Sequence, residues 1–128
     1  MEKSSMIKIE EMSKTITFFE QMEQECGPVV IINRITVNPE ETDELLRVWA
    51  TDIEIMKGQP GYISAQLHRG VGGNSVFLNY SVWESVGHLK QAFNRPEFQV
   101  TLNDYPPSAV ASPHIFEKID IPGGYASK

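Results

Sequence analysis

The sequence predicts an α+β fold with an antiparallel sheet, because three patterns give a regular order of elements. A nearly continuous β-branched run covers residues 29–37, and an amphipathic helical pattern follows it directly. Two further strand patterns, at 62–69 and 75–83, are joined by a glycine-rich turn. A second helix and a last strand complete the order strand, helix, strand, strand, helix, strand, which is the ferredoxin-like βαββαβ arrangement.

The run at 29–37 is expected to be the central strand. Gly27-Pro28 precedes it and Asn38-Pro39 follows it, and apolar residues occupy both alternating sets. Such a strand is buried on both faces. It nevertheless carries Asn33 and Arg34, which point to opposite faces. A buried amide needs a hydrogen-bond partner, so either the fold, through the backbone or Asn79, or a bound ligand must satisfy Asn33.

Two helices are expected after this strand. Asn38, Pro39 and Glu41 provide an N-cap, a first-turn proline and a capping box, so a helix should begin at 39 and end before Gly58. Its apolar stripe consists of Leu45, Val48, Trp49, Ile53 and Met56. Ser85 should cap a second helix that runs through Phe93, with Pro96 kinking or restarting it.

The remaining segments are assigned to the two ends of the chain. Residues 114–121 read as the last strand, after a loop at 108–113. Near the N-terminus, apolar residues at helical spacing predict an extra amphipathic helix over 9–25, although 15–19 also fits a short strand. These residues are Ile9, Met12, Ile16, Phe19 and Met22. The expected organisation is an N-terminal extension at 1–26, a domain at 27–121 and a tail at 122–128.

The two faces of the predicted sheet are not equally covered. Two helices cover only one face of a βαββαβ sheet, whereas the first and third strands are apolar on both sides. A second copy of the chain is the simplest cover for the other face, which predicts a homodimer through the sheet.

Composition limits the classes of partner. The chain has 128 residues, a formal charge of −6 and a pI of about 5.0. It contains no basic run, so nucleic acid is not expected as a partner, and no apolar stretch reaches the length of a membrane span. The single cysteine, Cys26, excludes an internal disulfide and suits a reducing cytoplasm.

Several segments resemble the antibiotic biosynthesis monooxygenase domain, a dimeric α/β-barrel family. The resemblance rests on the run 33–37, the strand entry 60–62, the hairpin and the motif at 80–85, and covers about residues 27–121. The family includes cofactor-independent oxygenases of aromatic polyketides, quinol monooxygenases, heme-degrading enzymes and members without known activity. The resemblance therefore implies a cofactor-independent monooxygenase acting on an aromatic or quinol-type compound, with a non-catalytic dimeric module binding a small hydrophobic ligand or a protein as the alternative.

The heme-degrading branch matches this sequence poorly. That branch uses an asparagine on the first strand, which Asn33 matches, and a tryptophan and an iron-binding histidine further on, where this chain has Ala92 and Leu102. No cofactor is therefore expected. The histidines His68, His88 and His114 lack any short metal-ligand spacing, so no metal site is expected either.

The candidate site residues follow from this interpretation. Asn33 is the expected partner of a substrate oxyanion. His68 is the candidate base, because imidazole titrates near neutral pH, although a half-exposed position on an edge strand is the alternative. The candidate substrate-binding residues, which as a set could also be ordinary core, are Trp49, Tyr62, Asn79, Tyr80, Trp83 and Phe93.

Overall fold

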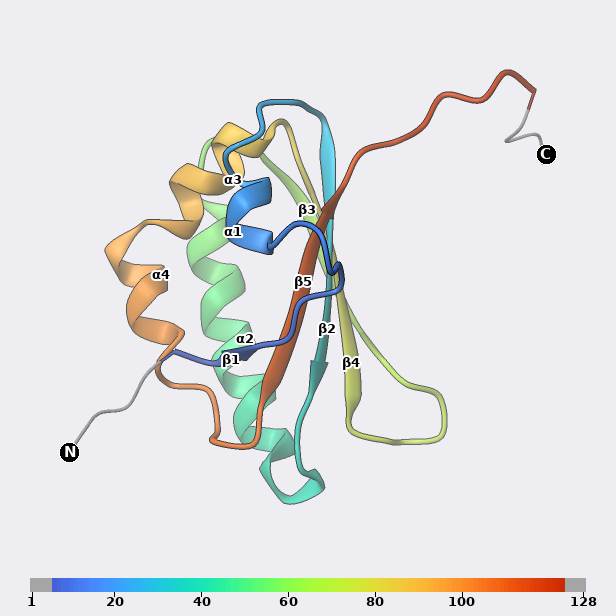
Figure 1. The fold of residues 1–128 in the computed structure, drawn as a ribbon. Coiled ribbons are helices and arrows are strands. Elements are labelled where there is room, and N and C mark those ends of the chain that lie inside the picture. Colours follow the sequence, from blue (N-terminus) through green and yellow to red (C-terminus); the bar gives the residue numbers. More distant parts are fainter. Residues whose placement is uncertain (1–5, 124–128) are drawn as a thin grey trace.

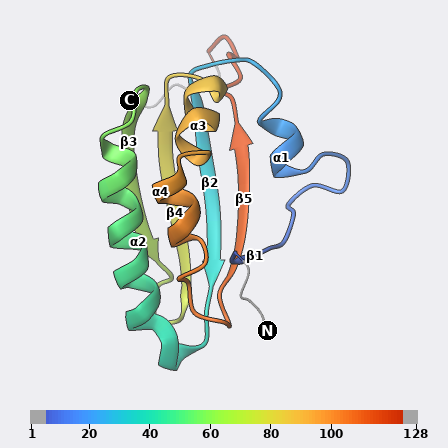
Figure 2. The ribbon, with the colours of Figure 1, turned by 90° about the vertical axis from the view of Figure 1, so that its left-hand side faces the viewer.

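The computed structural model describes residues 6–123 and confirms an α+β fold, with a five-stranded sheet and helices on one of its faces (Figures 1 and 2). The strands lie in the order β1-β5-β2-β4-β3. The strands are β1 (Lys8–Ile9), β2 (Val29–Thr36), β3 (Tyr62–Arg69), β4 (Val76–Trp83) and β5 (Val110–Phe116). The helical segments are α1 (Phe18–Gln21), η1 (Pro39–Glu41), α2 (Thr42–Lys57), α3 (Val86–Phe93) and α4 (Pro96–Thr101).

Strand β2 is central, as the sequence predicts. It pairs antiparallel with β4 on one side and with β5 on the other. Asn33 lies opposite Asn79 on β4 and opposite Pro113 on β5. Residues with odd numbers on β2 face the helices, where Val29, Ile31 and Ile35 are buried. The register therefore places the Asn33 side chain on the helix side of the sheet.

The helices keep their predicted places, but the start of α2 differs. A 3₁₀ turn precedes α2, and neither Asn38 nor Glu41 makes a side-chain cap bond. The predicted capping box is absent because the Glu41 carboxylate instead accepts hydrogen bonds from the amide and hydroxyl of Ser108. The later helix is capped by Ser85, as predicted, and Pro96 restarts it as α4.

The last strand lies earlier than predicted, at Val110–Phe116 instead of 114–121. Its pairing with β2 ends at Val30 and Phe116, close to where β2 itself begins, so the ladder cannot extend to residue 121. The predicted loop contains Pro113, which is tolerated in β5 because β1 pairs with only Val110 and Ala111 along the outer edge. The chain after β5 leaves the sheet and extends away from the body (Figure 1).

The extra N-terminal helix is present but far shorter than the predicted 9–25. The structure confines it to Phe18–Gln21, capped by Thr17 and Glu20. The helical spacing is interrupted because the Ser13 hydroxyl accepts bonds from the amides of Thr15 and Ile16, which forms a local turn. Upstream of this turn the chain is extended and forms β1, parallel to β5.

The side chain of Gln21 joins α1 to the edge of the sheet through hydrogen bonds. The amide of Gln21 accepts a hydrogen bond from the Ile115 backbone N–H at 2.9 Å and donates one to the Ile115 carbonyl at 3.0 Å. This pair imitates the bonding of a neighbouring strand at an otherwise open edge. Phe18 and Met22 are buried in the adjoining core.

Within residues 6–123, no helix is both long and apolar enough to cross a bilayer.

Candidate functional site

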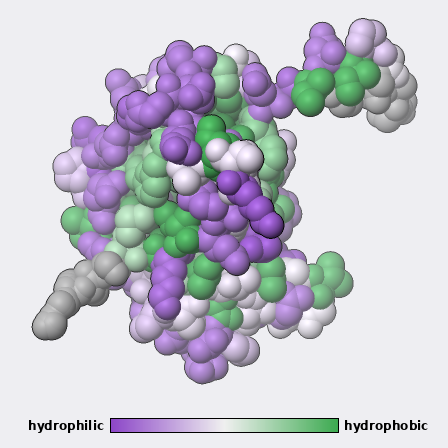
Figure 3. Space-filling model, in the orientation of Figure 1, coloured by the Kyte–Doolittle hydropathy of each residue, from purple (hydrophilic) through white to green (hydrophobic). Residues whose placement is uncertain are grey.

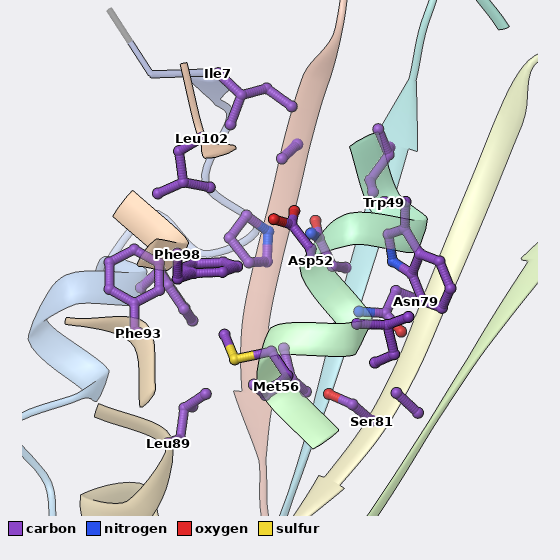
Figure 4. A pocket seen from close by; sticks show the side chains of 18 of the residues that line it. Ile7, Trp49, Asp52, Met56, Asn79, Ser81, Leu89, Phe93, Phe98 and Leu102 are labelled. Carbon is purple, nitrogen blue, oxygen red and sulfur yellow. The ribbon is translucent and has the colours of Figure 1, made fainter. Parts of the chain in front are cut away.

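A pocket of about 130 Å³ lies between the helix-facing side of the sheet and the helices (Figure 4). Its walls are mostly apolar and aromatic, which is typical of small-molecule sites. The N-terminal segment contributes Ile7 and Ile9 to the lining, and the Ile7 amide donates to the Leu102 carbonyl at 2.9 Å. On the face seen in Figure 3, apolar side chains gather beside the helices near this segment, within a mainly polar surface.

Two facing amides lie in the sheet floor, which also contains Ser81 on β4. Asn33 and Asn79 are directly opposite on neighbouring strands, and both line the pocket. The Asn33 oxygen accepts a hydrogen bond from the Ser112 amide at 3.0 Å, so its NH₂ group is the donor that remains for other partners. The Asn79 oxygen is buried and has no hydrogen-bond partner. The floor therefore offers a donor and an unused acceptor side by side.

The aromatic residues named by the sequence reasoning are mostly in this pocket. Trp49, Tyr62, Trp83 and Phe93 line it. Tyr62 and Trp83 make an edge-to-face contact with ring centroids 5.5 Å apart. Trp83 is also almost completely buried and belongs to the core beneath the pocket, so the core and pocket-wall interpretations both apply to it.

Two of the sequence candidates lie outside the pocket. Tyr80 alternates with Asn79 and therefore points to the opposite, helix-free face of the sheet, where it is 41% exposed. His68 is also exposed, and its Nδ1 lies 3.3 Å from the Leu78 carbonyl. The strand period separates both side chains from the amides on the pocket side.

The three histidines are far from forming one site. His88 is bonded to the Ser85 hydroxyl at the start of α3, and His114 lies 3.1 Å from the Gln21 amide nitrogen at the edge of β5. Within residues 6–123, no group of three or more His, Cys, Asp or Glu side chains is arranged to hold a metal ion.

The pocket contains a carboxylate that the sequence reasoning missed. Asp52 projects from α2 into the lining, only 6% exposed (Figure 4). It lies three residues after Trp49 and four before Met56, so it belongs to the apolar stripe of the helix. That position was the available signal: an acidic residue on the buried face of an amphipathic helix requires an explanation.

Two hydroxyl groups bind this carboxylate. Thr101, at the end of α4, and Tyr105, in the loop after it, each contact one of its oxygens. Burial raises the pKa of Asp52 to about 6, although both hydroxyls act in the opposite direction. Burial and the neighbouring Asp52 charge raise the pKa of Tyr105, so the phenol stays protonated and acts as a donor.

The fold and this pocket define a class of protein: a small α+β domain whose one-sided helix layer encloses a largely apolar site with a few polar groups. Residues 28–103, more than half of the chain, match the sequence profile of the antibiotic biosynthesis monooxygenase family. The chain belongs to that family.

Solved structures of other proteins have the same fold. SnoaB, a cofactor-independent oxygenase from Streptomyces nogalater, superposes with a TM-score of 0.65 at 21% identity, over 75% of this chain and 97% of SnoaB. A conserved protein from Methanosarcina mazei superposes with a TM-score of 0.64 at 16% identity, over 79% of this chain and 99% of the other. At such identities the likeness establishes the shared fold.

A sequence relative is an uncharacterized protein from Synechocystis. It is 30% identical over 71 residues, which are 56% of this chain and 48% of the relative. The match therefore spans about half of the relative's length.

Proposed function

We propose that this protein is a cofactor-independent monooxygenase that oxidises a small aromatic compound carrying a hydroxyl group, such as a phenol or a quinol. The support is the family membership together with the chemistry of the pocket floor. In this reaction dioxygen places one oxygen atom on a ring carbon and the other leaves as water. The substrate supplies all four electrons, so a phenol becomes a quinone.

The observation that carries the proposal is the pair of amides at Asn33 and Asn79. A buried acceptor without a partner costs about 1–3 kcal/mol, and the Asn79 oxygen is in that state. A substrate hydroxyl would satisfy it by donating to Asn79 while accepting from the Asn33 NH₂ group. Once the hydroxyl loses its proton, the Asn33 donor would stabilise the resulting oxyanion in largely apolar surroundings.

The lining of the pocket supports an aromatic substrate. Its walls contain tryptophan, tyrosine and phenylalanine side chains, which favour contacts with another ring. Apolar side chains such as Leu89 and Leu102 lie on the helix side. The polar groups of the lining are few: the two asparagines, Asp52 and the hydroxyls of Ser81 and Tyr105.

The test uses 1-naphthol, a bicyclic phenol, with ¹⁸O₂. Turnover should give 1,4-naphthoquinone that carries one ¹⁸O atom, together with enzyme-dependent oxygen uptake. Non-enzymatic oxidation of 1-naphthol by dioxygen would proceed at the same rate without the protein. Trp49 and Trp83 line the pocket, so quenching of tryptophan fluorescence measures binding separately. If 1-naphthol or 1,4-naphthoquinol binds but neither causes oxygen uptake, the result would support the alternative, a non-catalytic binding module.

We also propose that two copies of the chain associate through the helix-free face of the sheet. Leu78 and Tyr80 on β4 and Phe116 on β5 are large apolar residues that are 37–43% exposed. Alternation along the strands places them on the face that no helix covers (Figure 1). A second copy would bury this surface by a two-fold contact.

A further inference from the structure

We propose that Asp52 is the base of the pocket, taking the proton from the substrate hydroxyl, and that Thr101 and Tyr105 are positioning residues that hold it. This inference rests on the proposed function, because it assigns a residue to the proton-transfer step of the same reaction. It gives Asp52 the role of base that the sequence interpretation gave to His68, which lies on the other face of the sheet.

The location of Asp52 is difficult to explain by stability alone. The side chain is 6% exposed and lies on the apolar stripe of α2, and the two groups that bind it are neutral hydroxyls. A buried carboxylate is ordinarily paired with a cation, because burying a lone charge is costly. Asp52 instead shares a cavity with Asn33 and Asn79, on the side opposite the sheet floor.

The contacts of Thr101 allow Asp52 to exist in both protonation states. The Thr101 hydroxyl has a single hydrogen, yet it contacts both the Asp52 carboxyl and the Phe98 carbonyl, the latter at 2.8 Å. When Asp52 is ionised, Thr101 donates to it. When Asp52 is protonated, the carboxyl donates to Thr101, whose hydrogen rotates to Phe98. A base must alternate between these two states, and here a single hydroxyl rotation satisfies both.

The electrostatics are suited to a base that operates near neutral pH. Burial raises the pKa of Asp52 to about 6, and the charge of Asp104 acts in the same direction. The other titratable group in contact is Tyr105, which stays protonated and donates. The polar groups facing it from the sheet, Asn33 and Asn79, are uncharged amides. At pH 7 the carboxylate is therefore mainly ionised but more basic than an exposed one.

The proton step balances within the proposed reaction. The substrate hydroxyl has one hydrogen, so it first exchanges its hydrogen bond to Asn79 for one to Asp52 while its oxygen still accepts from Asn33. The O–H bond then breaks, the proton binds a carboxylate oxygen of Asp52, and the electron pair remains on the substrate as a phenolate. The ring carbon para or ortho to that oxygen then reacts with dioxygen to give a peroxide anion. This anion takes the proton back from Asp52 and becomes a hydroperoxide. Loss of the ring C–H proton and the hydroxide of the hydroperoxide releases water and leaves the carbonyl.

The deciding experiment measures kcat and KM for 1-naphthol from pH 4.5 to 9 by oxygen uptake. The wild type should show an acid limb in kcat/KM with a midpoint of about 6. Asp52→Asn, which keeps the size of the side chain, should lose kcat by about a hundredfold or more with little change in KM, because a general base contributes at least that much. Its remaining activity should lack the acid limb.

Two further variants separate a base from a structural residue. Thr101→Val removes a donor that favours the ionised carboxylate, so the acid limb should move to higher pH. Glu41→Gln neutralises another carboxylate held by hydroxyl and amide groups, at Ser108 outside the pocket, and should leave the profile unchanged. A Thr101→Val profile that coincides with the wild type would overturn the positioning role.

The experiment also separates this inference from the proposed function. If the wild type turns over 1-naphthol and Asp52→Asn matches it in rate and pH profile, only the assignment of Asp52 is overturned. If the wild type shows neither oxygen uptake nor ¹⁸O incorporation, the proposed function is overturned and the base with it. Infrared difference spectra offer a readout without turnover: a protonated-carboxyl band absent in Asp52→Asn should titrate near pH 6, and its absence above pH 4.5 contradicts the inference.

Discussion

At the scale of single residues, Asn33 and Asn79 lie opposite each other on neighbouring strands but differ in their hydrogen bonds. Asn33 already serves the fold, because its oxygen accepts the Ser112 amide hydrogen. The oxygen of Asn79 is buried and has no hydrogen-bond partner within the described residues. Mutating each asparagine in turn therefore distinguishes a contribution to stability from a contribution to turnover.

We expect Asn33→Ala to lower the free energy of unfolding by about 1–3 kcal/mol, because the Ser112 amide loses its acceptor. Asn79→Leu, of similar size, should leave stability unchanged or raise it, because an unsatisfied buried oxygen is removed. Both should lower turnover of 1-naphthol, Asn33→Ala by on the order of a hundredfold. Urea unfolding and oxygen uptake measure these effects. A large loss of stability in Asn79→Leu would show that its amide is structural.

Asp52 should make the protein less stable as the pH rises. Its pKa is raised on folding from 3.8 to about 6, so the folded state binds the proton more tightly than the unfolded state does. The stabilisation that proton binding gives is complete below pH 3.8 and is lost as the pH rises through 6. This difference between the two pKa values corresponds to about 3 kcal/mol. Asp52→Asn should therefore be more stable than the wild type at pH 7.5, with the difference shrinking toward pH 4. Urea unfolding at several pH values checks this, and an equal difference at every pH would contradict it.

At the scale of elements, the short helix α1 depends on contacts with the rest of the fold: Phe18 and Met22 are buried in the core, and Gln21 bonds to the sheet edge. A helix of four residues has little stability of its own, and Gln21 supplies it with two hydrogen bonds to Ile115. Strand β1 is likewise short, and Ile9 within it and Ile7 just before it line one side of the pocket.

We expect Gln21→Ala to lower the free energy of unfolding by about 1–3 kcal/mol, because the Ile115 amide and carbonyl lose their partner. Proteolysis between β1 and β2 should become faster. Gln24→Ala, three residues later and exposed, is the matched control and should behave as the wild type. If the two variants melt at the same temperature, the Gln21 bonds contribute nothing to the attachment of α1.

At the scale of the whole molecule, the sheet has one covered and one uncovered face. The covered face contains the core and the pocket, whereas Leu78 and Tyr80 lie on the other. The proposed dimer follows from this asymmetry, since an exposed apolar sheet face invites association.

We expect sedimentation at micromolar concentration to show a dimer. Leu78→Lys should convert it to a monomer by placing a charge in the apolar contact. Val100→Lys is the matched control: Val100 is 61% exposed on α4, in the helix layer, and its replacement should leave the dimer intact. A wild type that sediments as a monomer would overturn the proposal.

The sequence determined the central strand, the helix–strand order and much of the pocket wall. The β-branched run with its flanking prolines fixed β2, and strand alternation set Asn33 on one face once the covered face was known. Trp49 and Phe93 were on recognisable amphipathic helices. These features depend on local periodicity and on turn residues, which a single sequence displays directly.

Tertiary structure decided what depends on contacts distant in the chain. The pairing of β5 with β2 moved the last strand to Val110–Phe116, and the turn at Ser13 ended the expected helical pattern of 9–25. Above all, only the folded structure shows that Thr101 and Tyr105, about fifty residues after Asp52, bind its carboxyl group. Burial and hydrogen bonding set the proton affinity of a carboxyl group, and both are properties of the folded surroundings rather than of the residue itself.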